Sequence, residues 1–384
     1  MNSITKSTTV PGLLRNIVGY VHDENTTFLL HKVKENWVEI SYKHVLDNAD
    51  AISSYFLEMG ISKGDRLALI IENSVDWIYY DQGLQQIGGV NVSIYPTLSE
   101  TEIEYILNDS GAKTLLAGSP FLFRKILKIA NNCPNLQIII PVFDDYQKYL
   151  PDSELNAGVI SLKNLIEEGE KTLNQYKKKI EITRDAILPS DLTSLIYTSG
   201  TTGTPKGVML THFNFVQNVK VCLEQIPVIN KDDLFLSFLP LSHVFERTAT
   251  YHVCCAVGSK IAFAQSLELL AKNMAEVKPT VMSCVPRLLE RIHDKAMKNG
   301  TSAGGLKAKI FLSSIETGKE FREVHEAGRK PNLILGIKKS IAEKLVFSKI
   351  KKKTGGRLKF MLSGGAALPK NVGEFFGNLG IKVL

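Results

Sequence analysis

Residues 197–207 of this 384-residue chain read Tyr-Thr-Ser-Gly-Thr-Thr-Gly-Thr-Pro-Lys-Gly. The stretch holds five serine and threonine hydroxyls, three glycines and Lys206. Glycine lets a backbone turn tightly, so that successive N–H groups can face one anion. The hydroxyls are further donors, Lys206 carries a full positive charge, and the N-terminus of a following helix would add positive potential. Together these groups predict a loop that holds a polyphosphate.

Two well-known phosphate loops of similar composition do not fit this stretch. A Walker loop requires G-x-x-x-x-G-K-[ST], but here Pro205 stands at the second glycine position and Gly207 follows the lysine. The G-x-G-x-x-G loop of kinases is absent as well. A flexible Ser/Thr/Gly linker is the remaining alternative. It is disfavoured because the stretch lies between an apolar β-like run, 192–197, and an amphipathic helical pattern, 212–222.

Short apolar runs alternate with helix-like segments through the first half of the chain. The expected strands cover residues 66–71, 90–94, 113–117, 137–141 and 192–197. A helix is expected over 75–87, and a capping box at Ser99 and Glu102 opens another that stops at Gly111. Apolar strands separated by helices predict a parallel sheet covered on both faces. Ligands of such sheets bind at the carboxyl ends of strands, where the 197–207 stretch falls.

A second alternating series follows, with expected strands at residues 234–238, 261–264, 280–285 and 358–362. Residues 286–350 form a long, mostly helical pattern. The segment 144–191 separates the two series and is polar and weakly patterned, so we interpret it as a connecting excursion with a solvent-facing helix over 167–179. The predicted fold class is therefore α/β, with two lobes of mainly parallel sheet flanked by helices.

Residues 197–212, YTSGTTGTPKGVMLTH, strongly resemble the phosphate loop of the AMP-forming acyl-CoA synthetases. These enzymes belong to the adenylate-forming superfamily, with firefly luciferase and peptide-synthetase adenylation domains. Three further segments match the family in the same order, namely LPLSHVFER at 239–247, VPR at 285–287 and SGGAALP at 363–369. The resemblance runs from about Trp37 to the last residue. HVFER and the later VPRLLERI are most similar to the long-chain fatty acid–CoA ligases.

The resemblance implies that residues 1–384 form the large N-terminal, AMP-binding domain of such an enzyme, incomplete at its C-terminus. It implies a first sheet lobe over roughly residues 60–215 and a second over roughly 15–55 plus 225–384. The chain stops in the strand pattern of 380–384. Family members continue with a Y-G-x-T-E motif, a barrel-like lobe, a hinge and a small C-terminal domain. We therefore expect a truncated polypeptide without these parts, with a natural short variant as the alternative.

The same resemblance implies a nucleotide site. Phosphate contacts are implied for Thr198, Ser199, Gly200, Thr201, Thr202, Gly203 and Lys206. Thr198 is also the candidate Mg²⁺ ligand, and its usual glutamate partner belongs to the Y-G-x-T-E motif. Gly364, Gly365 and Ala366 would line the adenine and acyl pocket, where small residues let planar groups approach the backbone. A plain strand–helix turn is the alternative interpretation of those three residues.

His243, which follows a Pro-Leu-Ser sequence, is implied to lie beside the reacting carboxylate and the α-phosphate. We assign it a catalytic role together with Lys206, although a lone histidine is most often structural. Ser242, His243 and Glu246 do not form a convincing hydrolase triad, because adjacent serine and histidine side chains point differently and no G-x-S-x-G elbow exists. Arg287 fits an exposed residue at a helix start equally well.

The activity implied by the resemblance is the ATP-dependent activation of a fatty acid, first to acyl-AMP and then to acyl-CoA. ATP, Mg²⁺ and coenzyme A are the implied cofactor and co-substrates. The family's small domain carries the lysine credited with adenylation, so we expect this chain by itself to have little or no ligase activity. Adenylation of an aryl or short-chain acid, a non-catalytic nucleotide- or acyl-binding protein, and a phosphotransferase or ATPase remain as alternatives.

Positive charge is concentrated in one segment of the chain. The net charge is +7, whereas residues 319–359 alone hold thirteen lysines and arginines against four glutamates. The densest part is 349–359. A solvated helix end is the plain interpretation, and attraction to an anionic membrane surface or to the phosphates of coenzyme A is the functional one. Nucleic acid is disfavoured, because aromatic residues are not interleaved with the charges.

Cysteine usage and hydropathy indicate the compartment. The five cysteines are odd in number and lack C-x-x-C spacing, which argues against a disulfide framework or a zinc site. No apolar run reaches the ~18–20 residues that span a bilayer. Residues 1–20 lack the continuous apolar core of a signal peptide. We expect a cytoplasmic protein, with peripheral membrane contact as a further option.

Overall fold

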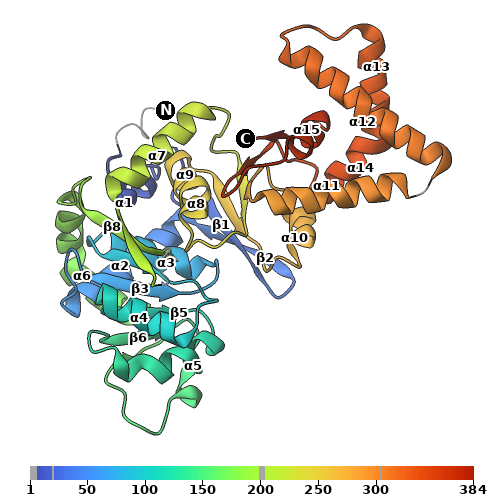
Figure 1. Ribbon diagram of the computed structural model, residues 1–384. Helices are drawn as coiled ribbons and strands as arrows, with labels where there is room; N and C mark the ends of the chain where they lie inside the picture. Colours follow the sequence, from blue (N-terminus) through green and yellow to red (C-terminus); the bar gives the residue numbers. More distant parts are fainter. Residues whose placement is uncertain (1–6, 20, 199–203, 303) are drawn as a thin grey trace. The chain divides into compact units, whose positions relative to one another are not determined.

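The computed structural model describes residues 7–19, 21–198, 204–302 and 304–384 (Figure 1). The chain divides into two compact units. The first comprises Met1–Lys231 and Pro240–Gly258, and the second comprises Asp232–Leu239 and Ser259–Leu384. Each unit contains a run of parallel strands with helices beside it, so the predicted α/β class is confirmed.

The sheet of the first unit has the strand order β7-β6-β5-β3-β4-β8-β9. Its members are β3 (Arg66–Ile70), β4 (Val90–Ser93), β5 (Thr114–Ala117), β6 (Ile138–Pro141), β7 (Gly158–Val159), β8 (Leu192–Thr198) and β9 (Lys206–Thr211). Neighbouring strands run parallel from β7 to β8, whereas β8 and β9 are antiparallel. The five strands expected in this half are therefore confirmed. Strands β4, β5 and β6 are buried at every residue, as expected of a parallel sheet covered on both faces.

The first unit contains further elements outside this sheet. They are α1 (Val10–Arg15), β1 (Thr27–Val33), β2 (Asn36–Ser41), α2 (Tyr42–Glu58), α3 (Val75–Gln85), α4 (Glu100–Ser110), α5 (Pro120–Ile129), α6 (Leu162–Asp185), α7 (His212–Gln225), α8 (Val244–Glu246), the π-helical turn η4 (Arg247–His252) and α9 (Val253–Val257). Strands β1 and β2 pair as an antiparallel hairpin. A cluster of buried aliphatic and aromatic side chains from β3 to β6, α4 and α5 forms a core on one side of the sheet.

Helix α4 confirms the boundaries expected from local signals. The hydroxyl of Ser99 accepts a hydrogen bond from the backbone N–H of Glu102, and the Glu102 carboxylate accepts one from the backbone N–H of Ser99 at 2.8 Å. Two N–H groups that the helix leaves unpaired are thereby satisfied. The helix ends at Gly111, whose φ of 61° lies in the left-handed region that glycine enters without strain.

Helix α6 differs from its prediction in length and in packing. The sequence predicted a solvent-facing helix over 167–179, but α6 runs over 24 residues and packs against α2. A Cβ atom at Gly169 would lie 2.0 Å from the carbonyl oxygen of Ala51, so only glycine permits this close approach. The predicted helix over 167–179 is present and mostly exposed, but it is part of a longer helix that one glycine and a few buried aliphatics attach to α2.

The residues after the 197–207 stretch also depart from expectation. The helix expected over 212–222 is confirmed as α7, which begins at His212, but an unexpected strand, β9, lies between it and the loop. Val208 and Met209 are both exposed on β9, which is the last strand of the sheet order, and its antiparallel pairing with β8 makes the stretch a β-hairpin. The positive end of a helix dipole therefore does not follow the loop, and backbone N–H groups, hydroxyls and Lys206 must supply the attraction for an anion.

The second unit contains parallel strands in the order β14-β13-β12-β10-β11. They are β10 (Leu234–Ser237), β11 (Lys260–Phe263), β12 (Val281–Cys284), β13 (Phe360–Ser363) and β14 (Lys382–Val383). The four strands expected in the second series are confirmed, as is the strand pattern of 380–384. The unit is held partly by Asp233, a buried carboxylate that accepts hydrogen bonds from Thr280 and Lys359, each at 2.7 Å.

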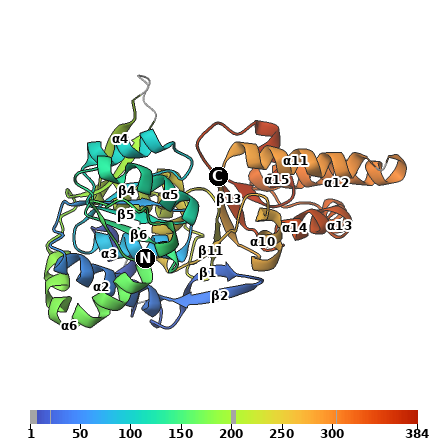
Figure 2. The ribbon, with the colours of Figure 1, turned by 90° about the horizontal axis from the view of Figure 1, so that it is seen from below.

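Helices dominate the rest of the second unit, as predicted for residues 286–350. They are α10 (Leu270–Val277), α11 (Pro286–Thr301), α12 (Gly305–Glu326), α13 (Leu333–Ala342), the π-helical turn η5 (Glu343–Phe347), α14 (Ser348–Lys353) and α15 (Lys370–Asn378). Helix α12 packs against α11, α13 and α15 (Figures 1 and 2). Among the described residues, no helix is both long enough and apolar enough to cross a bilayer.

Candidate functional site

Thr198 and Lys206, two of the predicted phosphate ligands, face each other across the β8–β9 hairpin. The antiparallel register pairs Thr198 with Lys206, and both residues are exposed. Five further predicted ligands, Ser199, Gly200, Thr201, Thr202 and Gly203, lie outside the described residues. A hydroxyl and an ammonium group therefore stand at the two ends of the predicted phosphate loop.

Tyr197 anchors the end of this hairpin that is next to the loop. Its register partner is Gly207, where an added Cβ would lie 3.1 Å from the tyrosine ring, so glycine lets the ring cross the neighbouring strand. The Tyr197 hydroxyl donates to the Asp109 carboxylate, near the end of α4, at 2.5 Å. Burial and this carboxylate raise the pKa of Tyr197, so the hydroxyl keeps its proton and remains a donor. The loop therefore starts from a rigid support.

Lys206 is free to bind an anion. The side chain is exposed, and none of the residues that the structure describes forms an ion pair with it. An ammonium group that forms no ion pair with a described residue can neutralise a phosphate oxygen without first breaking such a contact. The geometry supports the phosphate role predicted for this lysine.

His243 is the N-cap residue of helix α8. Its Nδ1 accepts a hydrogen bond from the backbone N–H of Phe245 at 3.1 Å. Partial burial and the charge of Arg247 lower the pKa of His243, so the neutral ring dominates at neutral pH. Because Nδ1 is an acceptor, the proton of the neutral ring resides on Nε2. The exposed edge of this ring can therefore donate one hydrogen bond to a substrate oxygen.

Arg247, quoted above only as part of a motif, is the central residue of a buried polar cluster. The side chain is 1% exposed. Its Nε donates to the carbonyl oxygen of Leu241 at 3.0 Å, one Nη donates to the hydroxyl of Ser194 at 2.7 Å, and the other donates to the hydroxyl of Ser93. Ser93 and Ser194 belong to β4 and β8. One guanidinium thereby ties two strands to the turn that carries His243.

Asp81, on α3, balances this buried charge. Its carboxylate is fully buried and accepts hydrogen bonds from Asn91 at 2.7 Å and from the hydroxyl of Tyr251 at 3.1 Å. Desolvation lowers the pKa of Arg247 to about 10, and the attraction of Asp81 opposes that shift. Arg247 therefore stays charged at neutral pH. No sequence motif marked Asp81, because its role depends on a partner 166 positions away in the chain.

Two buried histidines lie beside this cluster and were not anticipated from the sequence. His212 begins α7, and its Nδ1 accepts a hydrogen bond from the backbone N–H of Val10 at 3.2 Å. His252 ends η4 with its ring 5.0 Å from that of Phe215. Burial lowers the pKa of His212 to about 4, and burial together with the charge of Arg247 lowers the pKa of His252 well below its ordinary value. Both rings are therefore neutral components of the core.

The second unit contains the predicted adenine-site residues, directly after β13. The backbone N–H of Gly364 donates to the carbonyl oxygen of Cys284 at 3.1 Å. Gly365 has a φ of 85°, and an added Cβ would find its nearest neighbour, Val285, only at 4.0 Å. Gly365 and Ala366 are exposed. Glycine is thus required here by the backbone conformation, and the small side chains leave the main chain open to a flat ligand. Arg287 is exposed at the start of α11, as the plain interpretation expected.

Magnesium would find few ligands in the part of the chain that the structure describes. Thr198 offers one exposed hydroxyl oxygen, and no group of three or more His, Cys, Asp or Glu side chains there could hold a metal ion. Mg²⁺ commonly keeps several waters and binds one or two protein oxygens together with substrate phosphates. The described residues therefore fit an ion that arrives with a nucleotide, and do not fit a resident metal centre.

Comparison with known proteins matches these features to one family. The profile of a family described as "AMP-binding enzyme" matches residues 21–384. Fatty acyl-CoA synthetase A of Dictyostelium discoideum is 33% identical over 337 residues, covering 88% of this chain and 47% of that protein. Long-chain-fatty-acid–CoA ligase 5 of Rattus norvegicus is 30% identical over 370 residues, covering 93% of this chain and 50% of that protein. The chain spans about half the length of these curated relatives.

A solved structure shares the fold. The A-PCP didomain of a carboxylic acid reductase from Segniliparus rugosus, in complex with AMP, superposes with a TM-score of 0.72. The similarity covers 100% of this chain and 53% of that chain, at 19% sequence identity. At this identity the similarity shows the architecture alone.

Proposed function

Because the chain belongs to the AMP-binding enzyme family, we propose that it is the nucleotide-binding part of an ATP-dependent long-chain fatty acid–CoA ligase. The observation that carries the proposal is the hairpin that sets Thr198 opposite Lys206, with both residues exposed, in a chain that matches the family over most of its length. The names of the two curated relatives support a fatty acid as the substrate. Residues 1–384 would form most of the large N-terminal domain, and the lobe boundaries expected from the resemblance stay a prediction.

The proposed reaction has two steps. A carboxylate oxygen of the fatty acid attacks the α-phosphorus of ATP, a new P–O bond forms, and the bond to pyrophosphate breaks to leave acyl-AMP. The sulfur of coenzyme A then attacks the acyl carbon, loses its proton and displaces AMP. Two anions must meet in the first step, so neutralisation of charge is the main requirement on the protein.

The roles of individual residues follow from this requirement and remain proposals. Lys206 would neutralise phosphate oxygens of ATP, together with the hydroxyls and N–H groups of residues 198–203. His243, neutral with its proton on Nε2, would donate to an oxygen of the carboxylate or of the α-phosphate. The open backbone at 364–366 would contact the adenine or the acyl-adenylate. Mg²⁺ would enter as the complex with ATP, with Thr198 as one oxygen ligand.

Exchange of labelled pyrophosphate into ATP tests this proposal. We expect exchange that depends on a long-chain fatty acid and is weaker with aryl or short-chain acids. Release of phosphate without any acid would instead indicate an ATPase, and exchange with aryl or short acids only would change the substrate class.

Ligand binding provides a second readout for the 384-residue chain, since its own exchange rate is expected to be low. Calorimetry with non-hydrolysable acyl-adenylate analogues of long, short and aryl acids measures the preference without turnover. Binding of the long-chain analogue alone supports the proposed substrate. Equal affinity for all three, with no exchange, would favour a non-catalytic binding protein.

The compartment and partners are also proposals. Coenzyme A is the expected second co-substrate, and a cytoplasmic location is supported by five cysteines that are all free thiols. Peripheral contact with an anionic membrane was expected from the basic segment 349–359. Two of its lysines are engaged internally, because Lys351 contacts Glu343 at 2.8 Å and Lys359 contacts Asp233 at 2.7 Å. The basic segment by itself is therefore a weak basis for that contact.

A further inference from the structure

Helix α13 and the turn that follows it present a row of apolar side chains to solvent. Leu333, Ile334, Ile337, Ile341 and Leu345 are exposed by 81%, 66%, 53%, 52% and 46%, respectively. We call these five residues the α13 face. Such exposure is unusual for large aliphatic side chains that lie side by side, because soluble proteins rarely leave contiguous apolar patches uncovered.

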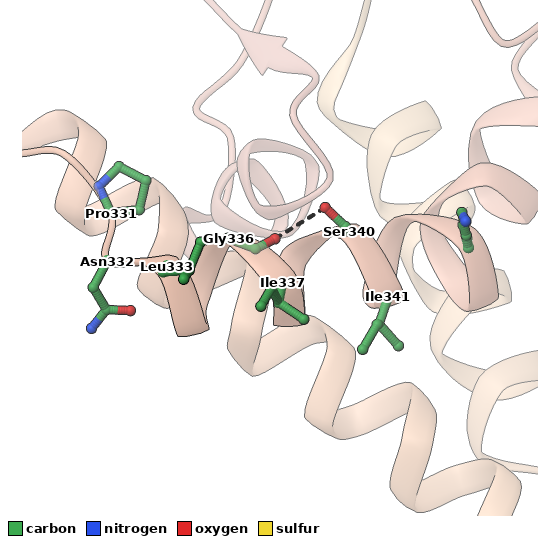
Figure 3. Close-up of a pocket in the computed structure, with 8 residues that line it drawn as sticks. Pro331, Asn332, Leu333, Gly336, Ile337, Ser340 and Ile341 are labelled. Carbon is green, nitrogen blue, oxygen red and sulfur yellow. Dashed lines mark hydrogen bonds between the residues drawn. The ribbon is translucent and has the colours of Figure 1, made fainter.

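The spacing of these residues places them on one side of the helix. Leu333, Ile337 and Ile341 recur every four residues on α13, which places them on one side of the helix, and Leu345 follows in the π-helical turn η5. Figure 3 shows Ile337 and Ile341 projecting from the same side of α13, along an open groove that Pro331 also lines. Leu335 and Ala342 are buried on the other side, where α13 packs against α12. The helix is therefore supported by one face and offers a second apolar face.

The surroundings of the α13 face are strongly basic. Residues 329–353 hold nine lysines and arginines against a single glutamate, Glu343. That glutamate already contacts Lys351. Lys338 and Lys344 are exposed next to the apolar row, and Lys349, Lys352 and Lys353 are exposed on α14 just beyond it. The apolar row thus lies in a segment of net positive charge, and Glu320 and Glu323 of α12 are the acidic groups that line a hollow with Ile334.

We propose that the α13 face docks onto an anionic lipid membrane, with its leucines and isoleucines in the interface and its lysines against the lipid headgroups. An apolar helix face with flanking lysines is the pattern of helices that lie in the plane of a membrane. The lysine stems can follow the apolar surface while their ammonium groups reach lipid phosphates. Juxtaposed basic residues add attraction to acidic lipids. This docking goes beyond the proposed ligase function and does not depend on it.

Two other occupants of the face are disfavoured by its chemistry. A second copy of the chain would bring two sets of like charges together around a symmetric contact, which opposes association. A protein partner usually meets a patch enriched in aromatic residues and arginine and depleted in lysine. The α13 face has the reverse composition, since it consists of leucine and isoleucine bordered by lysine. A lipid surface fits this composition best.

Sedimentation of the 384-residue chain with lipid vesicles tests the proposal. We expect binding to phosphatidylcholine vesicles that contain phosphatidylserine, weakening with salt, and little binding to phosphatidylcholine alone. The double variant Ile337→Glu/Ile341→Glu should lower the vesicle partition coefficient by about tenfold or more, because two carboxylates would enter the interface. The variant Lys338→Gln/Lys344→Gln should lower it roughly fivefold for each lysine removed.

Matched controls come from α6, a charged helix of the other unit. Ile182 is 60% exposed there, and Lys177 and Lys178 are exposed as well. Ile182→Glu and Lys177→Gln/Lys178→Gln should leave vesicle binding unchanged. All variants should melt like the unaltered chain by circular dichroism, and the lysine variants keep the test valid if a glutamate variant does not.

Three results would overturn the proposal. They are failure to bind phosphatidylserine vesicles, binding that the α13 variants do not alter, and concentration-dependent self-association that Ile337→Glu/Ile341→Glu abolishes. The last would assign the face to a contact between copies. Because vesicle binding and pyrophosphate exchange are separate measurements, failure of one proposal is distinguishable from failure of the other.

Discussion

Arg247 and Asp81 lie completely buried in the first unit, whereas Leu333 and Ile334 stand largely exposed on α13 in the second. The first unit therefore buries charged side chains, whereas the second exposes aliphatic side chains to solvent. Each of the two buried groups has its own hydrogen-bond partners, which for Arg247 come from β4, β8 and the turn before α8, so both are satisfied within the fold. The exposed row has no such compensation among the described residues and is explained best by a partner. The first arrangement should stabilise the fold, and the second should contribute to binding alone.

The largest expected effect is on the stability of the first unit. Arg247→Met removes the buried guanidinium, its hydrogen bonds to Leu241, Ser194 and Ser93, and the positive charge that acts on the buried Asp81 carboxyl, which costs about 3–5 kcal/mol. Urea denaturation followed by fluorescence measures the change. Arg291→Met, at an exposed position of α11, is the matched control and should stay near the unaltered stability. A loss below about 1 kcal/mol for Arg247→Met would show that the buried cluster is not a stabilising centre.

A dependence of stability on pH comes next. His212 and His252 have lowered pKa values in the folded state, to about 4 for His212 and well below the ordinary value for His252. The unfolded chain binds protons to these rings below its ordinary histidine pKa, near 6.5, whereas the folded protein does not. Their contribution is therefore fully present above pH 6.5 and is lost as pH falls toward 4. The expected slope is about 1.4 kcal/mol per pH unit for each histidine.

The variant His212→Asn/His252→Phe isolates this effect, because asparagine keeps an acceptor for the Val10 N–H and phenylalanine keeps a ring against Phe215. Denaturation midpoints measured between pH 4 and pH 7 should fall less steeply with acid in the double variant. His44→Asn, at an exposed position, should not change the slope. Parallel curves for the double variant and the unaltered protein would contradict the buried, neutral assignment.

Lys206 should affect binding without affecting stability. Since the side chain is exposed and forms no ion pair with a described residue, Lys206→Ala should leave the denaturation midpoint unchanged. Loss of a charged contact to phosphate should weaken ATP binding on the order of tenfold. Titration with a fluorescent ATP analogue measures this, and Lys231→Ala, at another exposed lysine, is the control. Unchanged affinity would remove Lys206 from the proposed site.

Little change in stability is expected on the α13 face as well. Substitution of Ile337 by glutamate should alter the free energy of unfolding by no more than ~0.5 kcal/mol, because the side chain is already half exposed. A loss of several kcal/mol would mean that the residue packs within the fold, and the contrast with Arg247 would disappear. Urea denaturation under the conditions used for Arg247→Met gives a direct comparison.

Local signals in the sequence predicted the elements that depend on neighbouring residues. The capping box at Ser99 and the stop at Gly111 set the limits of α4, because both act within one helical turn. The apolar runs of β3 to β6 were recognised because strands buried on both faces carry apolar residues throughout. The full extent of α6 was missed, since its attachment depends on Gly169 fitting against Ala51, a contact between distant parts of the chain.

The site divides in the same way. Thr198, Lys206 and the small residues at 364–366 were found because loops that hold phosphate or a flat ring need particular residue types at fixed spacing. The strand β9 was not predicted, and neither was the pairing of Thr198 with Lys206. A short apolar run can pair with any of several strands, and its sequence does not specify which one. Asp81, His212 and His252 were missed because a single buried polar residue has no local pattern.

The sequence by itself determined most strands of the two alternating series, the loop of 197–207 and the family to which the chain belongs. These follow from short-range periodicity, turn chemistry and motif spacing, all of which depend on residues that are close together in the sequence. Only the tertiary structure decided which charges are buried together and which aliphatics stay outside. Burial depends on contacts between residues far apart in the chain, so the roles of Arg247 and of the α13 face became visible only in the folded protein.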